Sequence, residues 1–150
     1  MDICVDSNIL IYSLNESSPF HVNTSDAILK LNSNGDEIIV FPQNLIEFWA
    51  VATRPISSNG LGFTTTRAAE ELAQIRSVFH LVTETPAIFP EWQRLVAANT
   101  VSGKSVHDTR IVAQMNVNNI DNILTLNAKD FSRYSNINAL EPGSVLTKDV

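Results

Sequence analysis

Residues 2–10 read DICVDSNIL, an apolar segment followed by three polar residues and a second apolar run. Residues 2–5 predict a short buried strand, and the chain is expected to turn at Asp6-Ser7-Asn8 into a helical turn that begins near Ile9. Four later apolar segments also predict strands, at residues 38–41, 79–82, 122–126 and 137–140. The sequence therefore predicts several short strands spread along the whole chain.

Helical patterns with capping residues and prolines lie between these strands. Helices are expected at residues 22–31, at 44–53 with Pro42 in the first turn, from 64–66 to 78, from Thr85-Pro86 through 98, and at 107–117. Loops are expected at 56–62 and 100–105, a turn or short helix at 127–134, and a tail at 141–150. Alternating strands and helices predict an α/β fold with a parallel sheet covered on both faces. Ligands of such sheets lie beyond the carboxyl ends of the strands, where the strand order reverses.

Composition limits the class of protein. The chain has 150 residues, of which 44% are hydrophobic, so it can form one domain with a real core. No apolar run approaches the roughly 18 residues that span a bilayer, and the N-terminal residues lack the pattern of a signal peptide. A cytoplasmic protein is therefore expected. The single cysteine, Cys4, lies in an apolar run and is expected to be buried and inert.

The net charge of −6 argues against binding of nucleic acid by a positive field alone. A phosphate-containing partner would need local help, which bound divalent metal could supply.

Two acidic residues follow predicted strands. Asp6 comes directly after the first strand, where its ordinary role is to cap the next helical turn. Asp130 lies a few residues after the strand at 122–126, where an Asp is also a common turn residue. Neither position alone indicates a function.

Two more acidic residues share helix faces with apolar side chains. Glu47 has Ala50 and Val51 three and four residues later, so its carboxylate needs a cation or several donors. An ion pair with Arg54 is the alternative. Asp108 precedes an apolar stripe in the same way, and its alternative role is the N-cap of the helix that follows.

The four acidic residues are expected to lie close together, which their separate structural roles do not explain. Two follow strands expected to be neighbours, and two lie on helices that pack toward the same sheet. Such a cluster is self-repelling unless metal is bound, and carboxylate oxygens suit Mg²⁺ or Mn²⁺. The sequence thus predicts a metal site.

Four segments also resemble a known family. They are VDSNIL at 5–10, the helix that contains Glu47, VHDTRI at 106–111 and LTLNAKDF at 124–131. In this order and at these intervals they resemble the PIN domain, and in particular the VapC-like ribonuclease toxins of bacterial toxin–antitoxin pairs. The resemblance runs from Met1 to about Pro142, so a PIN-like nuclease domain is expected at 1–142 and a C-terminal tail at 143–150.

The resemblance implies a single-domain three-layer α/β/α sandwich with a central, mainly parallel sheet of strand order 3-2-1-4-5. It implies a metal-dependent endoribonuclease with one or two Mg²⁺ or Mn²⁺ ions, whose four acids match Asp6, Glu47, Asp108 and Asp130. We expect Asp6 and Asp108 to bind metal directly, and the other two to do so directly or through water. Polar positions that support the acids in the family match Ser7, Asn8 and Asn127.

The resemblance also implies partners: an RNA substrate, an antitoxin protein and a second copy of the chain. Large apolar side chains of Phe48, Trp49, Phe63 and Trp92 offer a thinner physical basis for association, although core packing is their default role. Basic residues near the acidic motifs are candidate RNA contacts, namely Arg54, Lys104, Arg110, Lys129 and Arg133. The rival hypothesis is a catalytically silent module of the same fold that binds protein or RNA.

Overall fold

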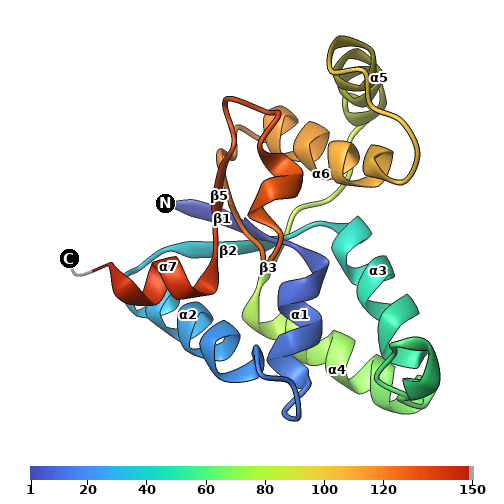
Figure 1. Ribbon diagram of the computed structural model, residues 1–150, viewed down its shortest axis with the longest axis vertical. Coiled ribbons are helices and arrows are strands. Elements are labelled where there is room, and N and C mark those ends of the chain that lie inside the picture. The colour runs from blue at the N-terminus through green and yellow to red at the C-terminus, as the bar shows by residue number, and fades with distance from the viewer. Residues whose placement is uncertain (149–150) are drawn as a thin grey trace.

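A single parallel sheet forms the centre of the computed structural model, which describes residues 1–148 (Figure 1). Its strands are β1 (Asp2–Val5), β2 (Glu37–Val40), β3 (His80–Leu81), β4 (Asn122–Leu124) and β5 (Asn138–Leu140). They lie in the order β3-β2-β1-β4-β5, and all four pairings are parallel. This architecture confirms the predicted fold class and strand order.

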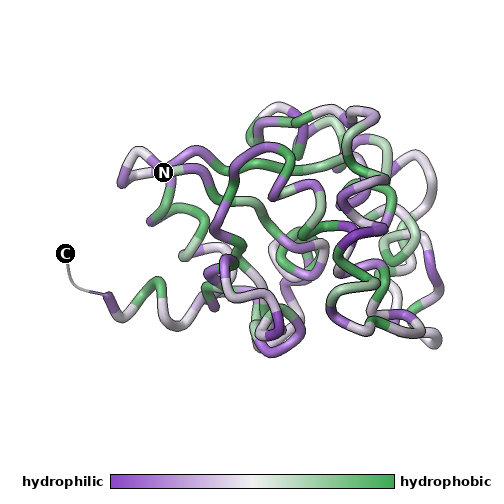
Figure 2. Tube along the Cα trace, turned by 90° about the horizontal axis from the view of Figure 1, so that it is seen from above, coloured by the Kyte–Doolittle hydropathy of each residue, from purple (hydrophilic) through white to green (hydrophobic). Residues whose placement is uncertain are grey.

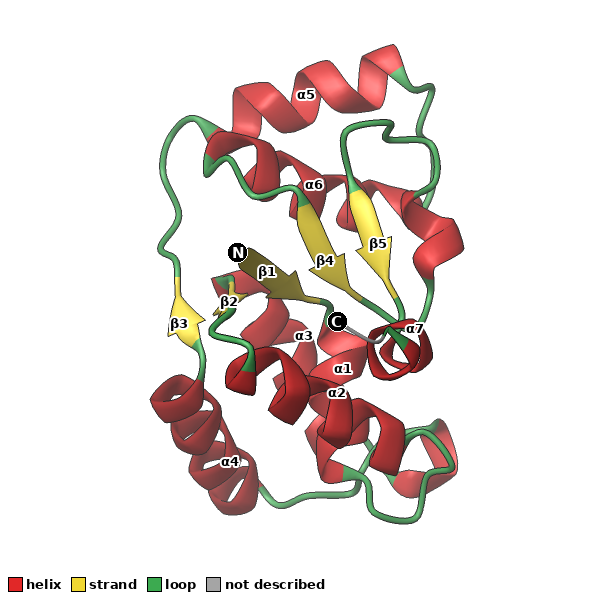
Figure 3. Cartoon of the chain, turned by 90° about the vertical axis from the view of Figure 1, so that its left-hand side faces the viewer, coloured by secondary structure: helices red, strands yellow, loops and turns green. Residues whose placement is uncertain are grey.

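Helices cover both faces of this sheet. They are α1 (Ser7–Leu14), α2 (His21–Ser33), α3 (Pro42–Thr53), α4 (Thr65–Val78), α5 (Ile88–Ala98), α6 (Ser105–Val117) and α7 (Pro142–Thr147), with short 3₁₀ helices η1 (Ile56–Ser58) and η2 (Ala128–Phe131). Helices α5 and α6 lie on one side of the sheet, and α1, α2, α3 and α7 lie on the other (Figure 3). Within residues 1–148, no helix is long and apolar enough to cross a membrane.

Successive side chains of each strand point to opposite faces of the sheet, and a hydrophobic core forms on each face. In β1, Ile3 and Val5 pack toward α1, α2 and α3, whereas Cys4 packs toward α5 and α6. Both sides of β1 are fully buried, so its sequence is apolar without alternation, as is typical of parallel sheets. Hydrophobic segments accordingly run through the interior of the trace, and many peripheral turns are hydrophilic (Figure 2).

Several predicted boundaries are wrong by a few residues. Helix α1 begins at Ser7 instead of near Ile9, because Asp6 caps it, and α6 begins at Ser105 inside the expected loop. Helix α5 begins at Ile88, after Thr85-Pro86, and η1 lies in the loop predicted at 56–62. Strand β4 ends at Leu124, two residues earlier than expected, and this difference bears on the functional site.

The tail predicted at residues 141–150 is a larger error, because residues 142–147 form α7. Pro142 fits the first turn of this helix, and Val145 is buried in the core. The Lys30 ammonium of α2 donates hydrogen bonds to the carbonyl oxygens of Val145 (2.9 Å) and Lys148 (2.7 Å) at the C-terminal end of this helix. Residues 149 and 150 of the predicted tail lie outside the described residues.

Candidate functional site

The first acid lies at the point where the strand order reverses. Strand β1 pairs with β2 on one side and with β4 on the other, and Asp6 follows it directly. The backbone of Asp6 is extended (φ −73°, ψ 156°), and its Oδ1 accepts a hydrogen bond of 2.8 Å from the backbone N–H of Ser7. Asp6 therefore has its ordinary capping role and also faces the edge where parallel sheets bind ligands.

Thr125 holds the second oxygen of this carboxylate. Its hydroxyl donates a 2.8 Å hydrogen bond to Asp6 Oδ2 and accepts one of 3.0 Å from the backbone N–H of Asn127. Thr125 is fully buried just after β4, where the early end of the strand turns its side chain toward Asp6. The sequence motif contained Thr125, but a residue expected inside a strand gave no signal of a supporting role.

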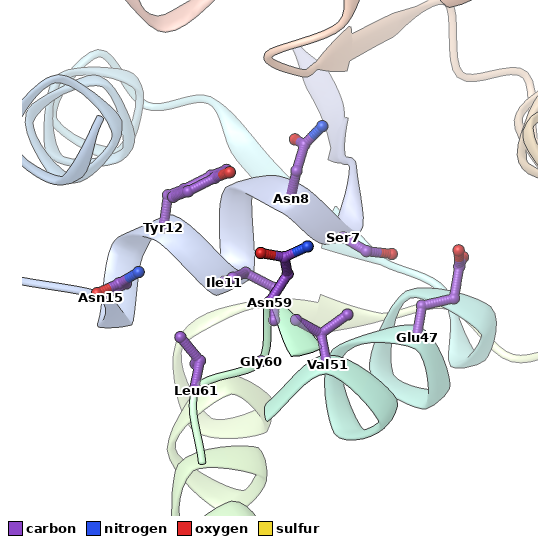
Figure 4. Close-up of a pocket in the computed structure, with 10 residues that line it drawn as sticks. All are labelled: Ser7, Asn8, Ile11, Tyr12, Asn15, Glu47, Val51, Asn59, Gly60 and Leu61. Carbon is purple, nitrogen blue, oxygen red and sulfur yellow. The ribbon is translucent and has the colours of Figure 1, made fainter. Parts of the chain in front are cut away.

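The three predicted supporting residues lie around Asp6 in different ways. The Asn8 amide donates to Asp6 Oδ2 over 3.4 Å, and its oxygen accepts from the backbone N–H of Leu126. Asn127 is exposed and contributes its backbone N–H to Thr125. The Ser7 hydroxyl is buried, has no hydrogen-bond partner within residues 1–148, and points toward Glu47 (Figure 4).

Glu47 extends from α3 toward the end of β1, as Figure 4 shows beside Ser7. Its side chain is half-buried, as its position next to an apolar face predicted. Among the ion pairs of residues 1–148, none joins Glu47 to Arg54, which is exposed at the end of α3. The alternative role of Glu47, an ion pair with Arg54, is thus wrong.

Asp108 lies in the first turn of α6, the helix that lies on the other side of the sheet from α3 (Figure 3). Because α6 begins at Ser105, the capping position belongs to Lys104, and the alternative role of Asp108 as the N-cap is wrong. Desolvation and the charges of Asp6, Asp130 and Glu47, in that order, raise the pKa of Asp108 to about 6. A helix N-terminus favours a negative charge, so burial and the other carboxylates outweigh the dipole here.

Burial and neighbouring negative charges also raise the pKa values of Asp6 and Glu47. Burial raises the pKa of Asp6 despite the hydrogen bonds from Thr125 and Ser7, and the charge of Asp130 raises it further. Burial and the charge of Asp6 raise the pKa of Glu47, although polar side chains nearby lower it. Asp130 itself is exposed in η2, and its charge acts on both other aspartates. The structure therefore brings all four predicted acids into one electrostatic cluster.

A hard divalent cation matches the chemistry of this donor set. The four carboxylates destabilise one another when charged, and a cation removes that repulsion. The buried Ser7 hydroxyl faces Glu47 and adds a further oxygen at the same place. In the described part of the chain, however, no three acidic, histidine or cysteine side chains are already grouped closely enough to hold an ion. The carboxylates would have to converge by side-chain rotation.

Gln43 connects the helices that carry Glu47 and Asp108, and the sequence gave no indication of it. Its amide donates to the His107 carbonyl oxygen (2.9 Å), and its oxygen accepts from Arg110 (3.0 Å) and Gln114 (3.0 Å). The Gln43 side chain also lowers the pKa of Glu47. This bridge fixes the first turn of α3 against α6.

The candidate RNA contacts differ in their availability. Arg110 donates to Glu84 (2.9 Å) and to Gln43, so its guanidinium is part of the wall beside Glu47. The other four side chains are exposed: Arg54 after α3, Lys104 before α6, Lys129 in η2 and Arg133 just after it. Lys129 and Arg133 lie one residue before and three residues after Asp130 in the sequence.

Replacing Asp108 by Asn should stabilise the metal-free protein. The pKa of Asp108 in the folded protein lies above its value of about 3.9 in the unfolded chain, so its ionisation lowers stability as pH rises between about 4 and 6. At pH 7 we expect Asp108→Asn to raise the free energy of unfolding by about 1 kcal/mol, after allowance for solvent screening of this half-exposed side chain. Urea denaturation with chelator at pH 5 and pH 7 measures the effect. A variant less stable than wild type at both pH values would give Asp108 a structural role.

Solved structures with the same fold include several from toxin–antitoxin systems. VapBC2 of Rickettsia felis bound to promoter DNA matches with a TM-score of 0.70 and 16% identity over 94% of this chain and 98% of that chain. VapBC-1 of nontypeable Haemophilus influenzae matches with a TM-score of 0.71 and 14% sequence identity, and the match covers 95% of this chain and 99% of that chain. A VapC of Mycobacterium tuberculosis, a toxin that cleaves the sarcin–ricin loop, matches with a TM-score of 0.64 and 18% sequence identity. This match covers 88% of this chain and 95% of that chain. At these identities the likeness concerns the fold.

Sequence comparison supplies the family. No curated protein sequence matches the chain significantly. The profile of the PIN domain, by contrast, matches residues 3–137, a span that includes β1, α3, α6 and η2 and therefore all four acids. This match covers most of the chain, and with the parallel sheet of order β3-β2-β1-β4-β5 it shows that the chain belongs to the PIN domain family.

Proposed function

We propose that this PIN domain is a metal-dependent endoribonuclease, the toxin of a toxin–antitoxin pair. One observation carries the proposal: at the switch point of the sheet, burial and the charges of neighbouring carboxylates raise the pKa values of Asp6, Glu47 and Asp108, and Asp130 is one of the charges that act on both aspartates. A cluster of this kind costs stability unless it binds a cation, so its presence supports a function over a structural role.

Each acid has a separate part in the proposed reaction. Asp6 is held by Ser7 and Thr125 and would ligate Mg²⁺ or Mn²⁺ directly, together with Asp108 on the opposite side. One or two bound ions would neutralise the scissile phosphate, lower the pKa of an attacking water and stabilise the leaving oxygen. Glu47 and Asp130 complete the ligand set, directly or through water, and accept hydrogen bonds from the attacking water.

The basic residues would hold the RNA backbone beside these acids. Two divalent ions would bring the formal charge from −6 to −2, so the acidic composition permits an anionic substrate. Lys104, Lys129, Arg133 and Arg54 offer exposed cations for phosphates. Arg110 is already paired with Glu84 and would act more weakly.

RNA is proposed as the substrate because a structural relative, the VapC of Mycobacterium tuberculosis, is a toxin that cleaves the sarcin–ricin loop. The alternative, a silent binding module, would not need four mutually repelling acids. Incubation of single-stranded RNA with the protein and Mn²⁺ tests the choice. We expect endonucleolytic fragments with 5′-phosphate and 3′-hydroxyl ends, and intact RNA would favour the silent module.

We also propose an antitoxin partner, a homodimer and a cytoplasmic location. The relatives from Rickettsia felis and Haemophilus influenzae are VapBC toxin–antitoxin structures, which supports a protein partner. Of the large apolar side chains considered for association, Phe48 is fully buried and Trp49, Phe63 and Trp92 pack against the core. The exposed apolar side chains include instead Ile46 and Phe89, which are 69% and 65% exposed.

If the protein is a homodimer, its mass in solution should be twice the chain mass of 16.5 kDa. Apolar side chains as exposed as Phe89 favour association when they gather at an interface. Light scattering at high micromolar concentration measures the mass, with Phe89→Ser as a variant expected to shift it toward the monomer. A monomer for the wild-type protein at that concentration would contradict the homodimer.

A further inference from the structure

A cavity of about 420 Å³ extends from the acidic cluster along α1 to the loop that follows α3 (Figure 4). Ser7 and Glu47 form its end at the acids, and Tyr12 and Asn59 line it farther along. Ile11, Val51 and Leu61 supply apolar surface. Tyr12 lies five residues after Ser7 on α1, about 7.5 Å along the helix axis. A molecule bound at the acids could therefore reach this part of the cavity.

Asn59 presents an unengaged carboxamide in this cavity. Within residues 1–148 its side chain makes no hydrogen bond, although both its amide and its oxygen are available. Its backbone is left-handed (φ 63°, ψ 30°), a conformation that Asn tolerates. Backbone hydrogen bonds fix the loop against α3, from Leu61 N–H to Val51 O (3.1 Å) and from Gly62 N–H to Arg54 O (2.9 Å).

The next residue, Gly60, shows how closely this loop approaches the helix. A Cβ at Gly60 would lie only 2.0 Å from the Arg54 carbonyl oxygen, so only glycine fits there. The loop backbone is therefore held close to α3 where it carries Asn59, whose exposed side chain lies at the solvent-facing edge of the cavity.

Tyr12 adds an aromatic surface with a polar end. Its ring is half-buried and packs edge-to-face on Phe20, with 5.3 Å between the ring centroids. The backbone carbonyl of Tyr12 is bonded to His21 Nδ1 (3.0 Å), which further fixes this end of α1. The cavity thus combines an aromatic ring, apolar contacts and a carboxamide, and among the described residues that line it Glu47 is the one with a charged side chain.

We propose that this cavity is a nucleobase subsite, which takes an unpaired base of the RNA near the scissile phosphate. The proposal rests on the proposed nuclease function and adds a specificity-determining site to it. An aromatic side chain can stack on a base, and a carboxamide offers the donor and acceptor that base edges require. A charged phosphate would gain nothing here, because the cavity holds no cation and one carboxylate.

Asn59 has an alternative role as a residue that merely tolerates a left-handed turn, and the chain contains a control for it. Asn59→Gly keeps the backbone conformation and removes the carboxamide. Asn119 is also left-handed (φ 56°), is exposed, and follows α6 away from the cavity, so Asn119→Gly makes the same change outside the proposed subsite.

The experiment measures RNA binding with the full chain carrying Asp6→Asn, so that the RNA stays intact. Fluorescence anisotropy with Mg²⁺ compares short single-stranded oligonucleotides of each base with an abasic oligonucleotide of equal length. We expect at least one base to bind about tenfold or more tightly than the abasic chain. Adding Asn59→Gly or Tyr12→Leu should remove most of that difference, and Asn119→Gly should leave it.

Equal binding of abasic and base-bearing chains, or an Asn59→Gly variant that keeps the full preference, would overturn the subsite. If Tyr12→Leu does not fold, Asn59→Gly alone decides the result. The wild-type cleavage assay separates this outcome from failure of the nuclease proposal. Cleavage without base preference removes the subsite alone, and base-dependent binding without cleavage removes the nuclease alone.

Discussion

Asp6→Asn is expected to cut single-stranded RNA at least about a hundredfold more slowly than the wild-type protein, with the fold unchanged. The substitution removes a charged metal ligand at the end of β1 but keeps an oxygen that can accept from the Ser7 N–H. The new amide can donate to the Thr125 hydroxyl, which now donates to Asp6 Oδ2. Since burial already raises the pKa of Asp6, loss of its charge should not destabilise the protein. Initial rates with Mn²⁺ measure the effect.

The same strand provides the matched control. Asp2 lies at the opposite end of β1 and is exposed, so Asp2→Asn makes the same chemical change away from the candidate site. Asp2→Asn should cut RNA at the wild-type rate. Equal losses in both variants would indicate a general effect of charge, and equal wild-type rates in both would place the chemistry elsewhere.

Metal binding is the second large expected effect. Isothermal titration calorimetry with Mn²⁺ should show Asp108→Asn binding more than about tenfold more weakly than wild type, because the ligand set loses a charged oxygen. The pKa of about 6 for Asp108 adds a signature, since metal must displace a proton from this carboxyl at or below that pH. Affinity should therefore increase as pH rises through about 6, and binding at pH 6 should release protons.

Repeating the calorimetric titration at pH 6 in two buffers of different ionisation enthalpy measures the proton release, because the observed binding enthalpy then differs between the buffers. The Asp108→Asn variant should release fewer protons, whereas Asp26→Asn, an exposed acid of α2, should behave as wild type. Unchanged affinity and proton release in Asp108→Asn would remove Asp108 from the metal site.

Local signals predicted the strands, the helices and the α/β class, whereas the strand order came from the family resemblance. Apolar strands such as Ile3–Val5 are buried on both faces, and Pro42 and Asp6 mark helix starts by their own chemistry. Glu47 and Asp108 were recognisable because carboxylates rarely share a helix face with apolar residues, whereas Asp6 and Asp130 were recognisable by their positions after strands and by the family resemblance. Segment 142–147 was missed because α7 is short and is stabilised by distant partners, above all Lys30.

Supporting residues could not be predicted in the same way. Thr125 acts on Asp6 across 119 positions of sequence, and Gln43 on His107 across 64, so no local pattern marks either pair. Arg110 looked available for RNA until its pairing with Glu84 was visible. Asn59 and Tyr12 are ordinary residues of a loop and a helix, and only the folded chain places them in one cavity.

The most direct test of a carboxylate metal site that cuts RNA is one cleavage time course with three additions in sequence. Purified protein and labelled single-stranded RNA are incubated with chelator, then with excess Mn²⁺, and then with chelator again. We predict no cleavage at first, cleavage after Mn²⁺ with 5′-phosphate products, and arrest after the second addition of chelator, with Asp6→Asn inactive throughout. Cleavage in chelator, or cleavage by Asp6→Asn at the wild-type rate, would contradict the account.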